Sequence, residues 1–284
     1  MIYLIAAVIL IALFLYIEDK CITVTEYTCR NHKVPDSFDG FRILHVSDLQ
    51  SAYFGKDQKS LIKKSENTKP DIIVFTGDLV DRNRTDLKAS MLAIKGLQEI
   101  APVYYINGNH ECRIADQLDD FYREMEKNNI TILRNEGCKI SHGDEYITVS
   151  GVWDDVLCSC KLGERRRDTE INPEPLLNVM KELTENLSPY DFNIILSHEP
   201  QFFDYYANER TDLVFAGHAH GGQIRLPFTE GLFAPGQGIL PKLTSGVHRK
   251  DGTEMIISRG LGNSVFPFRI FNRPELVLTV LKTT

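Results

Sequence analysis

The sequence has few cysteines and no excess of basic side chains. Six cysteines in 284 residues are too few and too unevenly spread for a disulfide scaffold. The 32 Lys and Arg residues stand against 39 Asp and Glu, a formal net charge of -7, so we expect no nucleic-acid partner. Metal ions can still supply the positive charge that phosphate binding needs. An apolar fraction of 43% excludes a disordered chain.

Charged side chains are also absent from residues 1–17, which are almost entirely aliphatic or aromatic. As a helix this run would span about 25 Å, near the lower limit for crossing a bilayer core. Glu18, Asp19 and Lys20 then end it. Neither the positive start nor the small-residue cleavage site of a signal peptide is visible. We interpret residues 1–18 as a single transmembrane anchor rather than a buried core helix.

The basic residues nearest the anchor all follow it, at Lys20, Arg30 and Lys33. This asymmetry favours a single-pass protein of the cell membrane with a cytoplasmic catalytic domain. Free cysteines at Cys112 and Cys158 favour the same side, although the opposite side stays open. Cys158 and Cys160 lack partners at the spacing of a zinc site.

The rest of the chain alternates predicted strands and helices. Residues 22–29 predict an edge strand, and short apolar runs predict buried strands at 41–46, 71–76, 103–106, 192–196, 213–216 and 275–281. Helical spacing covers 58–68, 85–100 and 173–187, while 140–152 and 247–258 predict strand pairs. The alternation indicates βαβ units around a central sheet buried on both faces. We see no interdomain linker and expect a connecting segment at 19–40 and one domain at 41–284.

Polar side chains follow these buried strands directly, and the carboxyl ends of strands meet at one sheet edge. They are Asp48, Gln50, Asp78, Asp81, Asn109, His110, His198, His218 and His220. Carboxylates, amides and imidazoles without cysteine describe a site for Mn, Fe, Zn or Co. The set is large enough for two ions if one carboxylate bridges them, an arrangement suited to phosphoryl displacement. Each residue alone is commonly a turn or core residue, so the prediction depends on their joint occurrence.

Four motifs within this set identify a resemblance. Gly77-Asp78-Leu79-Val80-Asp81, Gly108-Asn109-His110-Glu111, the isolated His198 and Gly217-His218-Ala219-His220 resemble the calcineurin-like metallophosphoesterases. The segments 221–224 and 258–262 resemble the membrane-associated bacterial phosphodiesterase branch, which includes UDP-2,3-diacylglucosamine hydrolases and cell-envelope phosphodiesterases. The resemblance runs from about residue 41 to the C-terminus. It implies an α/β (α+β) four-layer sandwich of two mixed β-sheets flanked by helices.

The resemblance also implies roles for individual residues. Asp48 and His220 would hold a first divalent ion, and Asp78 would bridge to a second. Asn109, His198 and His218 would complete that second site. His110 would protonate the leaving oxygen, with Asp81 orienting its ring. Mn is the favoured metal among Mn, Fe, Zn and Co.

One position departs from the family pattern, because Gln50 stands where the first motif normally has histidine. A glutamine oxygen is neutral and a poorer ligand for Zn than imidazole, so we expect a weaker first site. The alternative is a metal-poor, non-catalytic binding protein. His220 serves only that first ion in the family, and its presence favours a working enzyme.

We therefore expect a membrane-anchored dimetal phosphodiesterase or pyrophosphatase that hydrolyses an envelope or lipid-linked phosphoester by metal-hydroxide attack. A tethered nucleotide or cyclic-nucleotide phosphodiesterase is the alternative enzyme. The apolar segment 226–241 follows the last histidine motif, and it is either a packed loop or a flap that receives a lipid chain.

Overall fold

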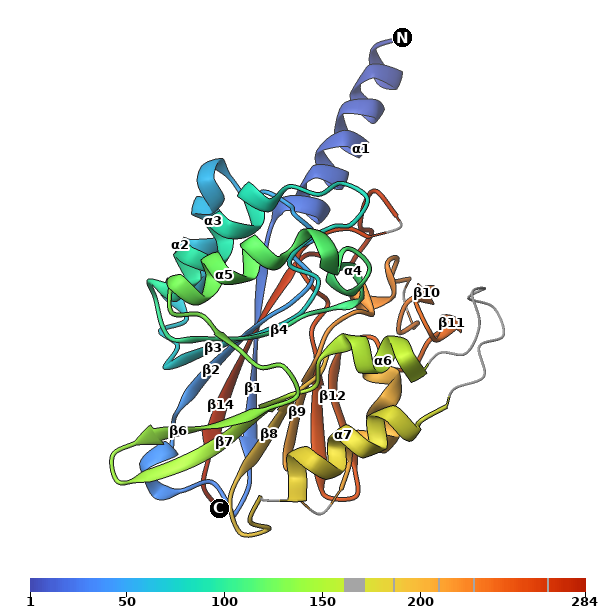
Figure 1. The fold of residues 1–284 in the computed structure, drawn as a ribbon. Helices are drawn as coiled ribbons and strands as arrows, with labels where there is room; N and C mark the ends of the chain where they lie inside the picture. Colours follow the sequence, from blue (N-terminus) through green and yellow to red (C-terminus); the bar gives the residue numbers. More distant parts are fainter. Residues whose placement is uncertain (161–171, 186, 209, 227, 265) are drawn as a thin grey trace.

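The computed structural model describes residues 1–284 except 161–171, 186, 209, 227 and 265. Two six-stranded mixed sheets lie face to face, with helices on their outer faces (Figure 1). The predicted architecture of two mixed sheets flanked by helices is confirmed. The pattern of apolar runs alone had indicated one central sheet, because periodicity does not say which strands pair.

The first sheet has the strand order β1-β14-β2-β3-β4-β5. Its strands are β1 (Thr23–Arg30), β14 (Glu275–Lys282), β2 (Arg42–Val46), β3 (Ile72–Thr76), β4 (Val103–Ile106) and β5 (Thr131–Ile132). Its covering helices are α2 (Lys59–Asn67), α3 (Leu87–Gln98) and α5 (Asp119–Lys127). β1 runs parallel to β14, whereas β14 runs antiparallel to β2.

The second sheet has the strand order β12-β13-β9-β8-β7-β6. Its strands are β12 (Gly246–Lys250), β13 (Thr253–Ile257), β9 (Leu213–Ala216), β8 (Asn193–Leu196), β7 (Glu145–Gly151) and β6 (Gly137–His142). The helices α6 (Asp154–Cys160), α7 (Glu174–Glu185) and α8 (Phe203–Tyr206) accompany this sheet. Short elements complete the domain: α4 (Asn109–Cys112), β10 (Phe233–Ala234), β11 (Gly238–Ile239), η1 (Asp36–Phe38), η2 (Lys56–Gln58), η3 (Ala115–Gln117), η4 (Pro200–Phe202) and η5 (His220–Gly222).

The continuous apolar strands are explained by burial on both faces. In β3, Ile73 and Phe75 pack with the helices of the first sheet, while Ile72 and Val74 pack between the two sheets. Successive side chains of a strand point to opposite faces, so a two-sided strand is apolar throughout. β8 repeats this, since Ile194 faces the other sheet and Ile195 the outer helices.

The strand and helix predictions agree with the structure within a few residues at each end. The helix α5 and the strand β5 were not predicted. Only Phe121, Tyr122 and Met125 are buried in α5, which is too short a pattern to separate a helix from a polar loop.

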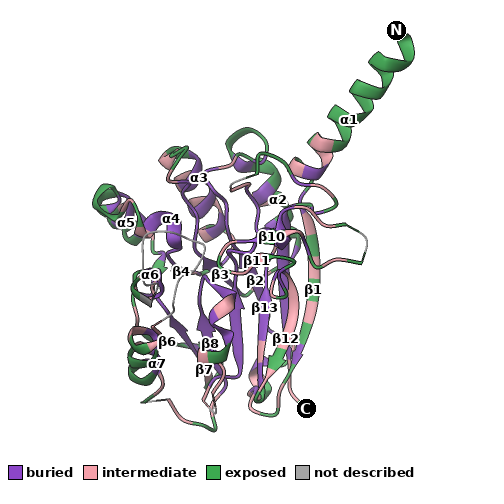
Figure 2. Ribbon diagram, turned by 90° about the vertical axis from the view of Figure 1, so that its right-hand side faces the viewer, coloured by how far each residue is buried: buried purple, intermediate pink, exposed green. Residues whose placement is uncertain are grey.

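The N-terminal helix α1 (Ile2–Lys20) extends away from the domain, and nearly all of it is exposed (Figure 2). It is the one helix of the described residues that is long and apolar enough to cross a membrane. Its exposure excludes the alternative of a buried core helix. The segment 19–40 contains β1, which is the edge strand of the first sheet.

Candidate active site

The predicted site residues come together at the carboxyl ends of strands from both sheets. Asp48 follows β2, Asp78 follows β3 and Asn109 follows β4 in the first sheet, while His198 follows β8 and His218 follows β9 in the second. All five side chains are buried. The structure also brings Gln50, Asp81, His110 and His220 to this edge, all of them buried.

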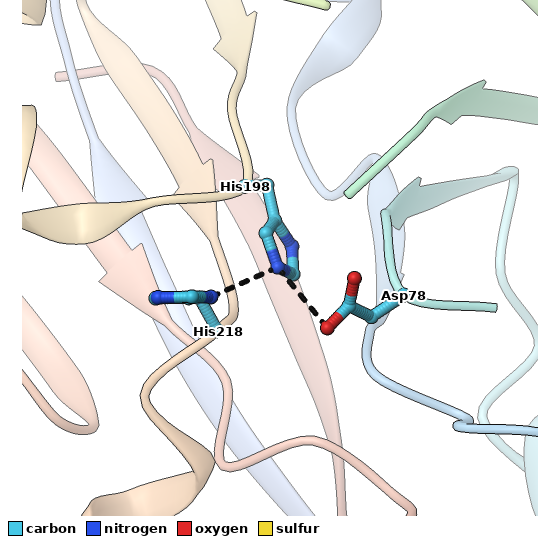
Figure 3. A group of neighbouring side chains, drawn as sticks. All are labelled: Asp78, His198 and His218. Atoms are coloured by element: carbon cyan, nitrogen blue, oxygen red, sulfur yellow. Dashed lines mark hydrogen bonds and ion pairs between the residues drawn. The ribbon is translucent and has the colours of Figure 1, made fainter. Parts of the chain in front are cut away.

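Two groups of buried ligand atoms share one carboxylate. Asp78, His198 and His218 form one group (Figure 3), and Asp48, Asp78 and His220 form the other. Within each group the ligand atoms lie within 4.8 Å of one another. Asp78 is therefore the carboxylate that the two groups have in common.

His198 is at the centre of the group that Figure 3 shows. Its Nε2 lies 3.4 Å from Asp78 Oδ2 and 3.1 Å from His218 Nδ1, and Asn109 Oδ1 is 3.3 Å away. Its Nδ1 lies 2.7 Å from the carbonyl oxygen of Thr76, so Nδ1 carries the hydrogen and Nε2 faces the group. Burial disfavours the charged ring, but the Asp78 carboxylate outweighs it and raises the pKa of His198. A strong preference for positive charge fits a cation at this point.

The other group contains the atypical glutamine. His220 Nε2 lies 3.4 Å from Asp48 Oδ1, and Gln50 Nε2 donates to Asp78 Oδ2 at 2.6 Å. Within the described part of the chain, the buried Gln50 Oε1 and His220 Nδ1 have no hydrogen-bond partner. Buried polar atoms are nearly always paired, so the orphaned Gln50 Oε1 fits a divalent ion, for which His220 Nε2, the nitrogen beside Asp48, would be the imidazole ligand.

The backbone is strained at five of the predicted site residues. Asp48, Gln50, Asp78, His218 and His220 have φ values of 53°, 53°, 52°, 65° and 47°. Such left-handed conformations cost of order 1–3 kcal/mol each and persist where the surrounding structure enforces them, often at functional sites. The strain thus falls on the proposed ligands themselves.

Two motif glycines are explained by close approach to these ligands. A Cβ atom at Gly217 would lie 1.9 Å from Ser47 Oγ and 2.4 Å from Asp48 Oδ2. A Cβ atom at Gly108 would lie 2.4 Å from Asp78 Oδ1. The motifs need glycine because side chains of the neighbouring ligand loops lie directly against the backbone at these two positions.

His110 lies beside the shared carboxylate and contacts Asp81. Its Nε2 is 4.0 Å from Asp78 Oδ2, and its Nδ1 is 3.4 Å from Asp81 Oδ1. Burial opposes charge on the ring, but the Asp78 carboxylate and then Asp81 raise the pKa of His110. Burial likewise opposes charge on Asp81, yet its bonds to His110, to the backbone N–H of Asn83 and to Arg84 lower its pKa to about 2. A charged Asp81 therefore faces the ring nitrogen that points away from Asp78.

Two supporting residues were not predicted from the sequence. The Glu111 carboxylate accepts hydrogen bonds from the backbone N–H groups of Asp78, Val80 and Gly108, at 3.0, 2.7 and 3.0 Å. Burial and the charge of Asp78 raise the pKa of Glu111 to about 7. The Asn272 amide donates to the carbonyl oxygen of His220. Glu111 stands inside a recognised motif, whereas nothing in the sequence around Asn272 signals its role.

A narrow cleft opens onto the site. It is lined by Asp78, Arg82, Asn83, Asn109, His110, His218, His220, Pro235 and Ser264. Pro235 belongs to the apolar segment 226–241, so that segment reaches the site. Ser264 belongs to the loop between β13 and β14.

Comparison with known proteins agrees with this geometry. The model of the calcineurin-like phosphoesterase family matches residues 41–222. The chain is 31% identical over 274 residues to the uncharacterized metallophosphoesterase YkuE of Bacillus subtilis, covering 95% of this chain and 88% of that protein. It is 26% identical over 250 residues to phosphodiesterase YaeI of Escherichia coli, covering 87% and 84%.

Two further similarities concern architecture. The chain is 24% identical to a transmembrane protein with metallophosphoesterase domain of Bos taurus, covering 88% of this chain and 55% of that protein. Among solved structures, TT1561 of Thermus thermophilus has a TM-score of 0.50 at 12% identity, covering 78% and 90%, a likeness of fold alone. The four motifs, the convergence of their residues and the family match lead to one conclusion: this chain belongs to the calcineurin-like phosphoesterase family.

Proposed function

We propose that the protein is a membrane-anchored, two-metal phosphodiesterase or pyrophosphatase acting on an envelope or lipid-linked phosphoester. The observation that carries the proposal is the sharing of Asp78 between two buried ligand groups. A shared carboxylate is what a pair of neighbouring ions requires.

The residues present fit such a pair. Asp48, His220 and the orphaned Gln50 Oε1 would hold one ion, and Asn109, His198 and His218 would hold the other. When bound, divalent ions lower the pKa of water and neutralise charge on phosphoryl oxygens. We favour Mn, because an amide oxygen at position 50 suits Mn better than Zn.

His110 is the proton donor of the proposed reaction. It lines the cleft, and its raised pKa supplies a charged ring that gives up a proton to the leaving oxygen. The Asp81 carboxylate, 3.4 Å from Nδ1, stabilises that charge and fixes the ring plane. The backbone N–H of Arg82 lies 3.2 Å from the same nitrogen, so it can donate to Nδ1 only when the ring carries its single hydrogen on Nε2.

The surroundings of the cleft favour a phosphoester substrate that carries a lipid. α1 is suited to a membrane anchor, and the segment 226–241 exposes Leu226, Phe228 and Ile239. Exposed apolar groups on a segment that reaches a polar cleft through Pro235 fit a substrate with a phosphoester head and a lipid tail. The net charge of -7 does not oppose this substrate once two divalent ions are bound.

The test is hydrolysis by the full-length protein in detergent, supplemented with Mn. An aryl phosphodiester, nucleotides and a lipid-linked pyrophosphate are supplied in parallel, and bound metal is counted by elemental analysis. His110→Ala should abolish turnover and keep the bound metal, while the exposed His32 provides a matched control, His32→Ala. Fewer than one ion per chain together with no hydrolysis would refute the enzymatic proposal. Turnover of nucleotides alone would refute the lipid-linked substrate.

A further inference from the structure

The loop between β13 and β14 exposes aromatic side chains beside α1. We call residues 263–273 the aromatic loop, described here except for residue 265. Phe266, Phe268 and Phe271 are 42%, 37% and 60% exposed. Of the loop's two cations, Arg273 is exposed and pairs with Glu18 Oε1 at 2.9 Å, whereas Arg269 is buried. A buried Arg269 below exposed rings inverts the usual arrangement, in which the charge faces water and the rings face the core.

The inversion is held by a set of hydrogen bonds. The Arg269 guanidinium donates to the carbonyl oxygens of Arg259 at 2.9 Å and of Gly262 at 2.6 Å, and to Asn263 Oδ1 at 3.1 Å. It also donates to the carbonyl oxygen of Asn272 at 3.2 Å, so its bonds reach both ends of the loop and fix its shape. The phenylalanines are therefore presented by a well-bonded support.

The same loop is joined to the end of the apolar helix. Glu18 Oε2 accepts from the backbone N–H of Asn272 at 2.9 Å, and Asp19 Oδ1 accepts from that of Arg269 at 2.7 Å. One turn earlier in α1, Phe14 packs edge-on against Phe271 with ring centroids 5.4 Å apart. The apolar surface of α1 thus continues onto the aromatic loop.

The loop also lies at the catalytic end of the domain. Thr23, just after α1, pairs with Glu275 of β14, and Val277 of β14 pairs with His45 of β2. The start of β14 is therefore beside the end of β2, where Asp48 follows. Figure 1 shows the red loop beside the base of α1, at the end of the domain that carries α4. Ser264 of the loop lines the cleft itself.

We propose that the aromatic loop inserts Phe266, Phe268 and Phe271 into the membrane interface next to α1 and so holds the catalytic cleft at the bilayer surface. The inference rests on the proposed anchoring function of α1. Its occupant is the lipid bilayer, because the exposed rings are continuous with a helix suited to that environment. The cleft would then receive the phosphoester head of a lipid that keeps its tail in the membrane.

The experiment uses tryptophan reporters in the full-length protein, reconstituted into vesicles with and without brominated lipids. Trp153 is the single tryptophan, and the wild-type signal gives its contribution. Phe266→Trp and Phe268→Trp report on the loop. Leu10→Trp reports on α1. The control is Tyr190→Trp: Tyr190 is 86% exposed and precedes β8, so it lies at the end of β8 away from the catalytic edge.

The inference predicts that brominated lipid quenches both loop reporters and the α1 reporter but not the control. If the α1 reporter is quenched and both loop reporters are not, the anchor stands and the inference is wrong. A loop buried in a dimer interface would also leave both loop reporters unquenched while the α1 reporter is quenched. If the α1 reporter itself is unquenched, the proposed anchoring fails and the inference falls with it. Two loop positions are used so that one poorly folded variant does not decide the outcome.

Discussion

The side-chain amide of Asn272 donates a hydrogen bond to the backbone carbonyl oxygen of His220 at 2.7 Å. The same amide donates to the carbonyl oxygen of Gln223 at 3.0 Å, and the backbone N–H of Asn272 donates to Glu18. One buried residue thus joins the end of the apolar helix to a strained ligand loop of the site. Sequence separations of about 50 and 250 residues hide this relationship from any local pattern.

Asn272→Ala should destabilise the protein and weaken its binding of the first ion. The change removes both amide bonds. The carbonyl oxygen of His220 keeps the backbone N–H of Gln223 as a donor, whereas that of Gln223 loses the Asn272 donor, at about 1–3 kcal/mol for the lost partner. Chemical denaturation measures the free energy of unfolding, and elemental analysis measures metal content. Asn67→Ala, at an exposed residue, is the control. Unchanged stability and metal content would mean that the His220 loop is held by other contacts.

Gln50→His should tighten the binding of divalent ions. Imidazole is a better ligand than a neutral amide, and we expect about a tenfold gain, equivalent to about 1.4 kcal/mol. Titration of metal-stripped protein with Mn or Zn followed by calorimetry checks this. An unaltered affinity would show that position 50 does not contact the ion and that Gln50 serves only its bond to Asp78.

Asp81→Asn should lower kcat and shift its pH dependence while metal content stays the same. An outer carboxylate that positions a functional histidine typically contributes 10–100-fold. Without the Asp81 charge, the pKa of His110 falls, so the alkaline limb of the pH profile, where His110 loses its proton, moves to lower pH. Asp120→Asn, at an exposed site on α5, should change neither quantity. A drop in kcat with an unmoved profile would indicate a purely structural role for Asp81.

His45 should make the fold sensitive to acid. This ring is fully buried against Phe215 and bonds Thr76 Oγ1, and burial lowers its pKa to about 3. Because the unfolded chain binds the proton near pH 6.5, the contribution of neutral His45 is complete above that pH. It is lost as the pH falls toward 3.

The variant that tests this pH dependence is His45→Gln, because glutamine keeps a polar partner for Thr76 and does not titrate. Between pH 6.5 and 5 the wild type should lose about 2 kcal/mol relative to the variant. Denaturation curves at several pH values give this difference. Parallel curves for the two proteins would show that His45 is protonated in the folded state.

Much of the candidate site could be predicted because its signals are local. Each buried strand is a short apolar run followed at once by its ligand, as in 71–76 before Asp78. Strand burial and ligand chemistry depend on residue type and on near neighbours. The length and charge-free composition of residues 1–17 likewise predict an apolar helix, and α1 is one.

The remaining features depend on contacts between distant segments. The division of strands between two sheets, the Glu111 bonds that join two loops and the Asn272 link are set by how elements pack. Cys158 lacks a partner at zinc-site spacing, yet the fold brings the ligand atoms of Cys112, Asp154 and Cys158 within 4.8 Å of one another. Residue types along the chain specify the chemistry of the ligands and the apolar character of the first helix. The helix, the aromatic loop and the catalytic edge share one end of the domain because strand pairing aligns β1, β14 and β2, and no local pattern encodes that pairing.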